Sequence, residues 1–142
     1  MENLHQLVNR LTADHQNSVE RNDSYFINDI PCDLSLDHNL PWITSVISSL
    51  LATVGCHARK TCIRLSAQKQ GHVIVLIIKE SGKTNGYVMA NDLQQAYLLA
   101  EKIGGCLSIS VPTIDYTTIS FSFPHIPSVA AMAQIGIMTD RN

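Results

Sequence analysis

The sequence predicts an α+β fold, a two-layer α/β sandwich with two main helices on one face of a mixed sheet of four or five strands. Three observations support this prediction. Residues 41–54 carry a long apolar stripe at helical spacing, residues 92–103 carry a second one, and each stripe is followed by two alternating or apolar runs separated by a turn. The order helix, strand, strand, helix, strand, strand is typical of helices packed on one side of a sheet.

Composition sets the class of protein. The chain of 142 residues is 45% apolar and 15% charged, which fits one globular domain with a single core. The net charge of −2 gives no basic surface, so nucleic acid is not an expected partner. Residues 1–16 lack an apolar signal core, and the longest apolar run, Val73 to Ile78, is too short to span a bilayer. We therefore expect a cytoplasmic protein without membrane insertion.

The cysteines Cys32, Cys56, Cys62 and Cys106 are widely spaced and form no Cys-x-x-Cys pair. A disulfide framework is not expected in this context. Cys56, His57 and Cys62 are an alternative set of zinc ligands, but their spacing matches no standard structural zinc pattern. We expect small buried thiols and no metal site.

The N-terminal region contains a helical pattern over residues 3–20. Leu4, Leu7, Val8 and Leu11 form a narrow stripe that ends at Leu11, so this helix should pack along its first half. Residues 21–39 are rich in Asp, Asn and Ser and predict irregular chain, with a short strand near Ser24 to Ile27.

The next segment gives the most secure helix, over residues 41–54. Asn39 can cap it and Pro41 is tolerated in its first turn. Its inward stripe consists of Trp42, Ile43, Val46, Ile47, Leu50, Leu51 and Val54, and Gly55 breaks the pattern.

A hairpin, a helix and two further strands follow. Apolar residues alternate with polar ones from Thr61 to Gln68, "KQG" forms a turn, and Val73 to Ile78 predicts a buried central strand. The helix over 92–103 is capped near Asn91 or Asp92, and a Gly-Gly pair ends it. "CLSISV" and "YTTISFSF" predict two strands joined by "PTID".

From Leu36 to Pro124 the chain resembles the ATP-binding domain of sensor histidine kinases, of the GHKL or Bergerat-fold superfamily. "IGGCLSISVPTIDYTTISFSFP" is similar to the family's closing pattern, in which Gly-Gly, a strand and a turn precede Gly-Thr-x-Phe-x-Phe-x-Leu-Pro. "ITSVISSLLATVG" resembles the helix that bears the metal-binding Asn, and "VIVLIIKESG" resembles the strand that runs into the Asp-x-Gly-x-Gly adenine loop. The resemblance implies a Bergerat-like sandwich.

The resemblance also locates a nucleotide site and shows where this chain departs from it. Thr53 and Ser49 stand where the family has Asn, and Glu80 replaces the Asp that accepts the adenine amino proton. Gly82 is retained. A hydroxyl lacks the reach and the carbonyl oxygen of an amide as a magnesium ligand.

The phosphate-binding segment departs further. Ala90 and Asp92 replace glycines, and Asp92 places a negative charge where phosphate would lie, at an expected helix N-terminus. The short connection after Gly82 leaves no room for the family's lid. We interpret Ser49, Thr53, Glu80, Gly82, Ala90 and Asp92 as a vestigial nucleotide site. We expect no catalytic residue and no cofactor; ATP and Mg²⁺ belong only to the alternative in which weak binding persists.

His5 and His15 are the candidate phosphoacceptors. Neither has the acidic, Pro-containing surroundings of the family's acceptor motif, and the residues before position 36 are too few for two long helices and a linker. Ordinary solvated histidines are the simpler interpretation.

We expect an N-terminal helix and linker (1–35), the kinase-like domain (36–126) and an apolar C-terminal extension (127–142). The main hypothesis is a degenerate, non-catalytic domain that serves as a signalling or protein-interaction module. A residual ATP-binding domain of a sensor histidine kinase, a phosphotransferase-like protein with a vestigial ATPase domain, and a structural dimerisation unit remain open. The expected partner is a protein, such as a response regulator or kinase, or a second copy of the chain, which the extension would help to bind.

Overall fold

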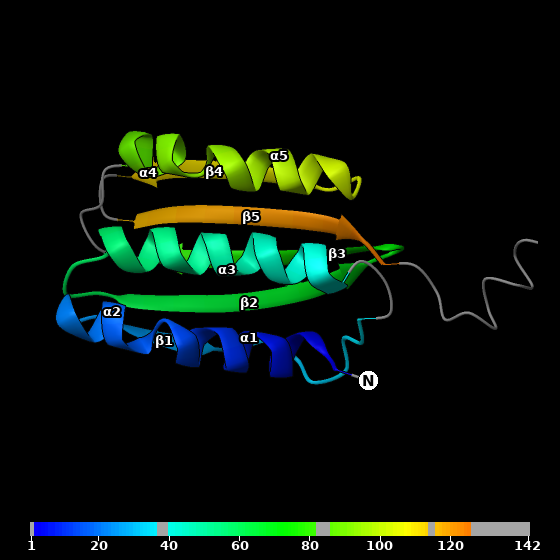
Figure 1. Ribbon diagram of the computed structural model, residues 1–142, viewed down its shortest axis with the longest axis horizontal. Coiled ribbons are helices and arrows are strands. Elements are labelled where there is room, and N and C mark those ends of the chain that lie inside the picture. Colours follow the sequence, from blue (N-terminus) through cyan, green and yellow to red (C-terminus); the bar gives the residue numbers. More distant parts are fainter. Residues whose placement is uncertain (1, 37–39, 82–85, 114–115, 126–142) are drawn as a thin grey trace, which may run out of the picture.

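The computed structural model describes residues 2–36, 40–81, 86–113 and 116–125. Within these residues a five-stranded sheet carries all the helices on one face, and α1, α3 and α5 run side by side across it (Figure 1). The elements are α1 (Leu4–Asp14), α2 (Gln16–Arg21), β1 (Tyr25–Asn28), α3 (Leu40–His57), β2 (Cys62–Gln70), β3 (Val73–Glu80), α4 (Gly86–Asp92), α5 (Gln94–Lys102), β4 (Cys106–Thr113) and β5 (Tyr116–Pro124). The predicted α+β sandwich is confirmed.

The sheet has the strand order β1-β2-β3-β5-β4. β1 pairs parallel with β2, and the other pairs are antiparallel, so the sheet is mixed as expected. In the central register Ile78 lies opposite Leu65 on one side and Ile119 on the other, and all three are buried beneath the helices. Both predicted hairpins and the short strand near residue 25 are present.

The N-terminal helix forms as its stripe predicts. Asn3 accepts the backbone N–H of Gln6, and the Gln6 side chain accepts the N–H of Asn3, which satisfies two donors at the start of α1. Leu4, Leu7 and Val8 are fully buried in the same core as the central strands. Residues on both sides of position 36 therefore contribute to one core.

α3 is the central helix, and its stripe is buried as predicted with one exception. Ile43, Val46, Ile47, Leu50, Leu51 and Val54 are at most 2% exposed. Trp42 is 44% exposed, with the Lys102 ammonium 5.6 Å from its ring centre, so its predicted inward position is wrong. The helix also continues through Gly55 to His57, so the break predicted at Gly55 is wrong; the missing Cβ instead lets α2 pack close, since a Cβ there would lie 3.0 Å from Val19 Cγ1.

By length and composition alone, α3 could cross a membrane, with a mean hydropathy of 1.3. Core helices of soluble proteins satisfy the same test, and the apolar stripe of α3 packs against the sheet.

The helix predicted from residue 92 starts differently in the structure. α4 already begins at Gly86, a turn at Leu93 interrupts the helical path, and Leu93 makes no side-chain cap hydrogen bond. The cap expected at Asn91 or Asp92 is therefore wrong, and Asp92 is the last residue of α4. The predicted stop at the Gly-Gly pair is confirmed: Gly104 has φ +73°, and a Cβ on Gly105 would lie 2.6 Å from the Ser122 carbonyl oxygen.

The cysteines are not buried as expected. Cys32, Cys56 and Cys106 are exposed and Cys62 is half-buried, and all four are reduced. They lie on loops, a helix surface and the outer face of the sheet, where they add nothing to the core. In the part of the chain that the structure describes, no three His, Cys, Asp or Glu side chains gather as a metal site.

The packing predicts unequal costs for two substitutions in α3. Leu50→Ala should lower the free energy of unfolding by about 2–5 kcal/mol, because it leaves a cavity in a fully buried site. Trp42→Ala removes a larger side chain but should cost less than half as much, since Trp42 is 44% exposed. Urea unfolding of both variants measures the difference; equal losses would contradict this placement of the helix.

Candidate functional site

The residues predicted as a vestigial nucleotide site come from three elements that meet at one end of the sandwich. The last turns of α3, the end of β3 and α4 all lie at this end (Figure 1). Thr53 and Ser49 are half-buried on α3, Glu80 is 2% exposed at the end of β3, and Ala90 is half-buried on α4. Gly82 lies outside the described residues.

Two buried polar side chains lie where the resemblance places the adenine. Glu80 is paired in register with Thr117 of β5, on the inner face of the sheet. Thr117 is 1% exposed, and its Oγ1 has no hydrogen-bond partner among the described residues. A buried hydroxyl left in this state costs about 1–3 kcal/mol, so the site has an unused polar atom that a ligand could satisfy.

Where the resemblance would place the phosphates, two side chains form a pair. His57 Nε2 lies 2.6 Å from Asp92 Oδ2, which ties the last turn of α3 to the last residue of α4 across 35 positions of sequence. The His57 side chain is 21% exposed and that of Asp92 is 52% exposed. The Asp92 carboxylate therefore has a partner within the protein, in the region where phosphate would need positive charge or N–H donors.

The two candidate phosphoacceptors differ in their surroundings. His5 Nδ1 lies 2.7 Å from the Ile30 carbonyl oxygen, and its Nε2 accepts from the Asn9 amide at 3.2 Å. Both ring nitrogens are thus engaged within the fold, as in a structural histidine. His15 uses Nε2 in a 3.2 Å contact with the Ser48 hydroxyl, between α2 and α3.

Sequence reasoning missed Thr117 and His57 as members of this site. Thr117 is in phase with Ile119, Phe121 and Phe123 on the inner face of β5, so the alternation could have marked it as a polar residue facing the core. The contact between His57 and Asp92 depends on how α4 packs against α3, and no local pattern reveals it.

No family model matches the sequence, and no curated protein matches it. Solved structures do. The histidine kinase AdeS of Acinetobacter baumannii superposes with a TM-score of 0.76 at 9% identity, over 88% of this chain and 66% of that chain. The catalytic domain of the histidine kinase ThkA superposes with a TM-score of 0.74 at 13% identity, over 89% of this chain and 96% of that chain. Full-length ShkA, solved in complex with AMPPNP, gives a TM-score of 0.70 at 8% identity over 88% of this chain.

These likenesses establish the fold of a histidine kinase catalytic domain. This chain spans 66% of the AdeS chain and 31% of the ShkA chain, so those proteins contain further regions that it does not match.

The pairing of His57 with Asp92 predicts an energetic coupling between α3 and α4. In a double-mutant cycle with His57→Ala and Asp92→Ala, the coupling in the free energy of unfolding should be about 0.5–1 kcal/mol, since the pair is partly exposed. His72, in the turn of the hairpin between β2 and β3, serves as the control. Its alanine variant should be additive with Asp92→Ala, and a zero coupling for His57 would contradict the contact.

Proposed function

We propose that this chain, which has the fold of a histidine kinase catalytic domain, is a degenerate and non-catalytic member of that structural class that serves as a signalling or protein-interaction module. The contact between His57 and Asp92 is the observation that carries the proposal. Phosphoryl transfer depends on positioned metal and positive charge around the phosphates. Here the corresponding place holds a carboxylate that already has a protein partner.

The metal position supports the same conclusion. Thr53 and Ser49 are half-buried on α3 and offer hydroxyl groups, which are shorter than the amide that the resemblance would place there. Magnesium requires near-octahedral oxygen ligands at about 2.0–2.1 Å and usually takes a carboxylate or amide from the protein together with the phosphates. A hydroxyl in a helix surface position contributes little to such a site.

The proposal predicts that ATP with Mg²⁺ binds weakly or not at all. Calorimetric titration should give a dissociation constant well above the low micromolar range, which corresponds to about −8 kcal/mol. A dissociation constant of that order or tighter would overturn the proposal.

A restoration variant tests the physical cause of this loss. Introducing Thr53→Asn together with Asp92→Gly supplies an amide and removes the carboxylate, so it should strengthen ATP binding by about tenfold or more. Ser45→Asn is the matched control, because Ser45 is exposed in the first half of α3, away from both ends of the candidate site, and should leave binding unchanged.

The buried Thr117 hydroxyl favours a second candidate, a residual nucleotide-binding domain that retains only the adenine end of the site. Adenosine lacks phosphate and needs no metal, so it tests this end alone. In the second candidate adenosine binds, and Glu80→Gln and Thr117→Val each weaken it by about fivefold or more. In the main proposal adenosine shows no saturable binding, whichever variant is titrated.

A phosphotransferase-like role is the remaining alternative. It needs an accessible imidazole nitrogen, and His15 fits this better than His5, whose two nitrogens are both engaged. Phosphoryl transfer from a phosphorylated response regulator to His15 is the experiment that separates this alternative from the main proposal.

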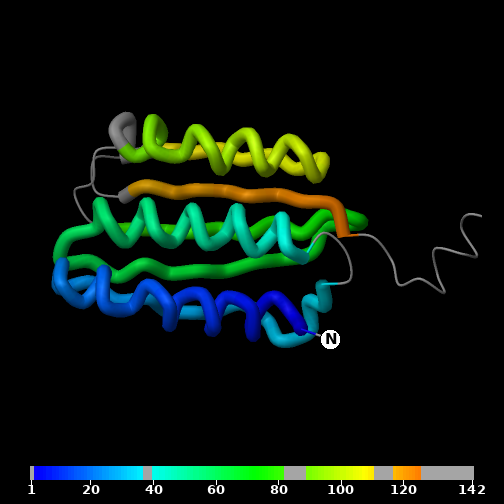
Figure 2. The backbone as a smooth tube through the Cα atoms, in the orientation of Figure 1, coloured from blue at the N-terminus to red at the C-terminus, as the bar shows by residue number. Residues whose placement is uncertain are grey.

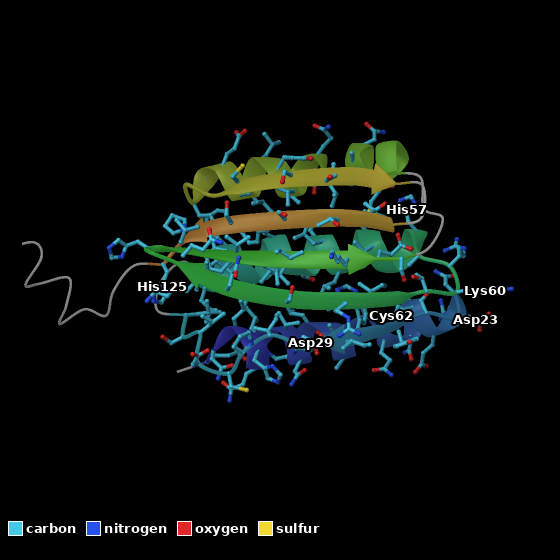
Figure 3. All side chains as sticks on the ribbon, turned by 180° about the vertical axis from the view of Figure 1, so that it is seen from behind. Asp23, Asp29, His57, Lys60, Cys62 and His125 are labelled. Carbon is cyan, nitrogen blue, oxygen red and sulfur yellow. The ribbon has the colours of Figure 1, made fainter. Side chains whose placement is uncertain are left out.

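The proposed partner is a protein, a second copy of this chain included, and the proposed setting is the cytoplasm. The described chain ends at His125, which lies at the opposite end of the sheet from His57 (Figure 3). The N-terminus and the end of β5 lie at that same end of the sandwich (Figure 2). The extension over 127–142 lies outside the described residues.

Deleting residues 127–142 tests the extension as a docking segment. Its apolar side chains would each leave area exposed at about 25 cal/mol per Å² if nothing covered them. Loss of association with an unchanged thermal midpoint supports a partner surface. A chain that is monomeric before and after the deletion, with a lowered midpoint, would show that the extension only completes the protein's own core.

A further inference from the structure

A groove separates α2 from the C-terminal half of α3, on a different flank of α3 from the vestigial nucleotide site. The two helices approach closely at Val19 and Gly55, and the Asn22 amide donates to the Gly55 carbonyl oxygen at 2.9 Å. Beside this contact the surface opens into a cavity of about 270 Å³, which we call the α2–α3 groove. It is lined by His15, Ser18, Arg21, Asn22, Ala52, Cys56 and Arg59.

The groove is cationic. Arg21, at the end of α2, and Arg59, just after α3, both line it together with His15, and none of its lining residues is acidic. The remaining lining side chains are small or are neutral hydrogen-bonding groups. A concentration of guanidinium charge without a nearby carboxylate in its wall is unexpected in a chain with a net charge of −2.

Both arginines have N–H donors that no acceptor among the described residues satisfies. Arg59 Nη1 donates to the carbonyl oxygens of Cys56 and Ala58, at 2.7 and 3.1 Å, which fixes the guanidinium at the end of α3. Its Nε and Nη2 make no hydrogen bond with the described residues, and Arg21 forms neither a hydrogen bond nor an ion pair with any of them. A positioned guanidinium with free N–H groups recognises the planar edge of a carboxylate or two oxygens of a phosphate.

We propose that the α2–α3 groove is an oxyanion-binding site, in which Arg21 and Arg59 hold one carboxylate or phosphate group of a ligand. Asn22 and Ser18 border the same space and can add neutral hydrogen bonds. This proposal is independent of whether ATP binds to the protein, because the groove lies on another flank of α3.

The test is a titration of the full chain, followed by amide and arginine side-chain NMR signals, with sodium phosphate and with sodium acetate at constant ionic strength. Saturable shifts should gather at Arg21, Asn22, Cys56 and Arg59. Arg21→Gln should weaken binding by about fivefold or more, since it removes a charge-assisted pair. Lys69→Gln, which removes one positive charge from the exposed hairpin, is the control and should leave binding unchanged.

The two anions distinguish the source of the group. A preference of tenfold or more for phosphate assigns the groove to a phosphorylated ligand, and equal or tighter acetate binding assigns it to an acidic side chain or carboxylate metabolite. Shifts that are absent with both anions, or that respond equally to Arg21→Gln and Lys69→Gln, would overturn the proposal.

A second measurement needs no variant. Iodoacetate is anionic and iodoacetamide is neutral, so the ratio of their alkylation rates at a thiol reports the local attraction for an oxyanion. Cys56 lines the groove, whereas Cys106 is exposed among serines at the edge of the sheet. The ratio should be severalfold higher at Cys56, and phosphate should lower it there alone; equal ratios at the two thiols would contradict a cationic groove.

Discussion

The packing of α3 against the centre of the sheet is the constraint on which the rest of the structure depends. Its buried face covers β2, β3 and β5, where Leu65, Ile78 and Ile119 lie in register. Once that face is fixed, helical geometry fixes the others. Thr53 and His57 are carried toward α4, and Ala52 and Cys56 are carried toward α2. The two candidate sites therefore lie on the two flanks of α3. The helix cannot rotate to change them, because rotation would expose its buried face.

The flank toward α4 is stable without a ligand because the protein supplies its own partner for the charge there. The Asp92 carboxylate lies at the end of α4, and His57 Nε2 contacts its Oδ2 at 2.6 Å. The flank toward α2 is the reverse case, since among the described residues its arginines donate hydrogen bonds only to the carbonyl oxygens of Cys56 and Ala58, at the end of α3 and just after it. Electrostatically, the first flank is closed by an internal pair and the second is open to an external anion.

Periodicity predicted most of the fold because the apolar face of each element is local information. The stripe of α1 and the alternating apolar residues of β2 and β5 face the core as expected. In the apolar run of β3 only Ile74, Leu76 and Ile78 are buried, whereas Val73 is 38% exposed, so the prediction of a fully buried strand is wrong: in the described part of the chain the outer face of the sheet carries no helix layer. The predictions that failed concern features that depend on contacts with residues distant in the sequence. Trp42 fits the helical stripe but lies beyond the edge of the covered area, beside Lys102. The turn at Leu93 contains no Gly or Pro, the residues that usually mark a break between helices in a sequence. For the site, resemblance located the positions of Thr53, Glu80 and Asp92, but the contact of Asp92 with His57 spans 35 residues and required the structure.

The solved structures reported above share this fold at 8–13% identity, with TM-scores of 0.70–0.76, so the fold tolerates wide changes of sequence. Thr117 is a residue that the packing of this fold does not require. A valine would fill the same volume without leaving a buried hydroxyl unsatisfied, so packing alone does not account for this residue. At the proposed adenine end Thr117 is thus a polar residue that the core does not need, whereas at the proposed phosphate end Asp92 is already held by His57 within the protein.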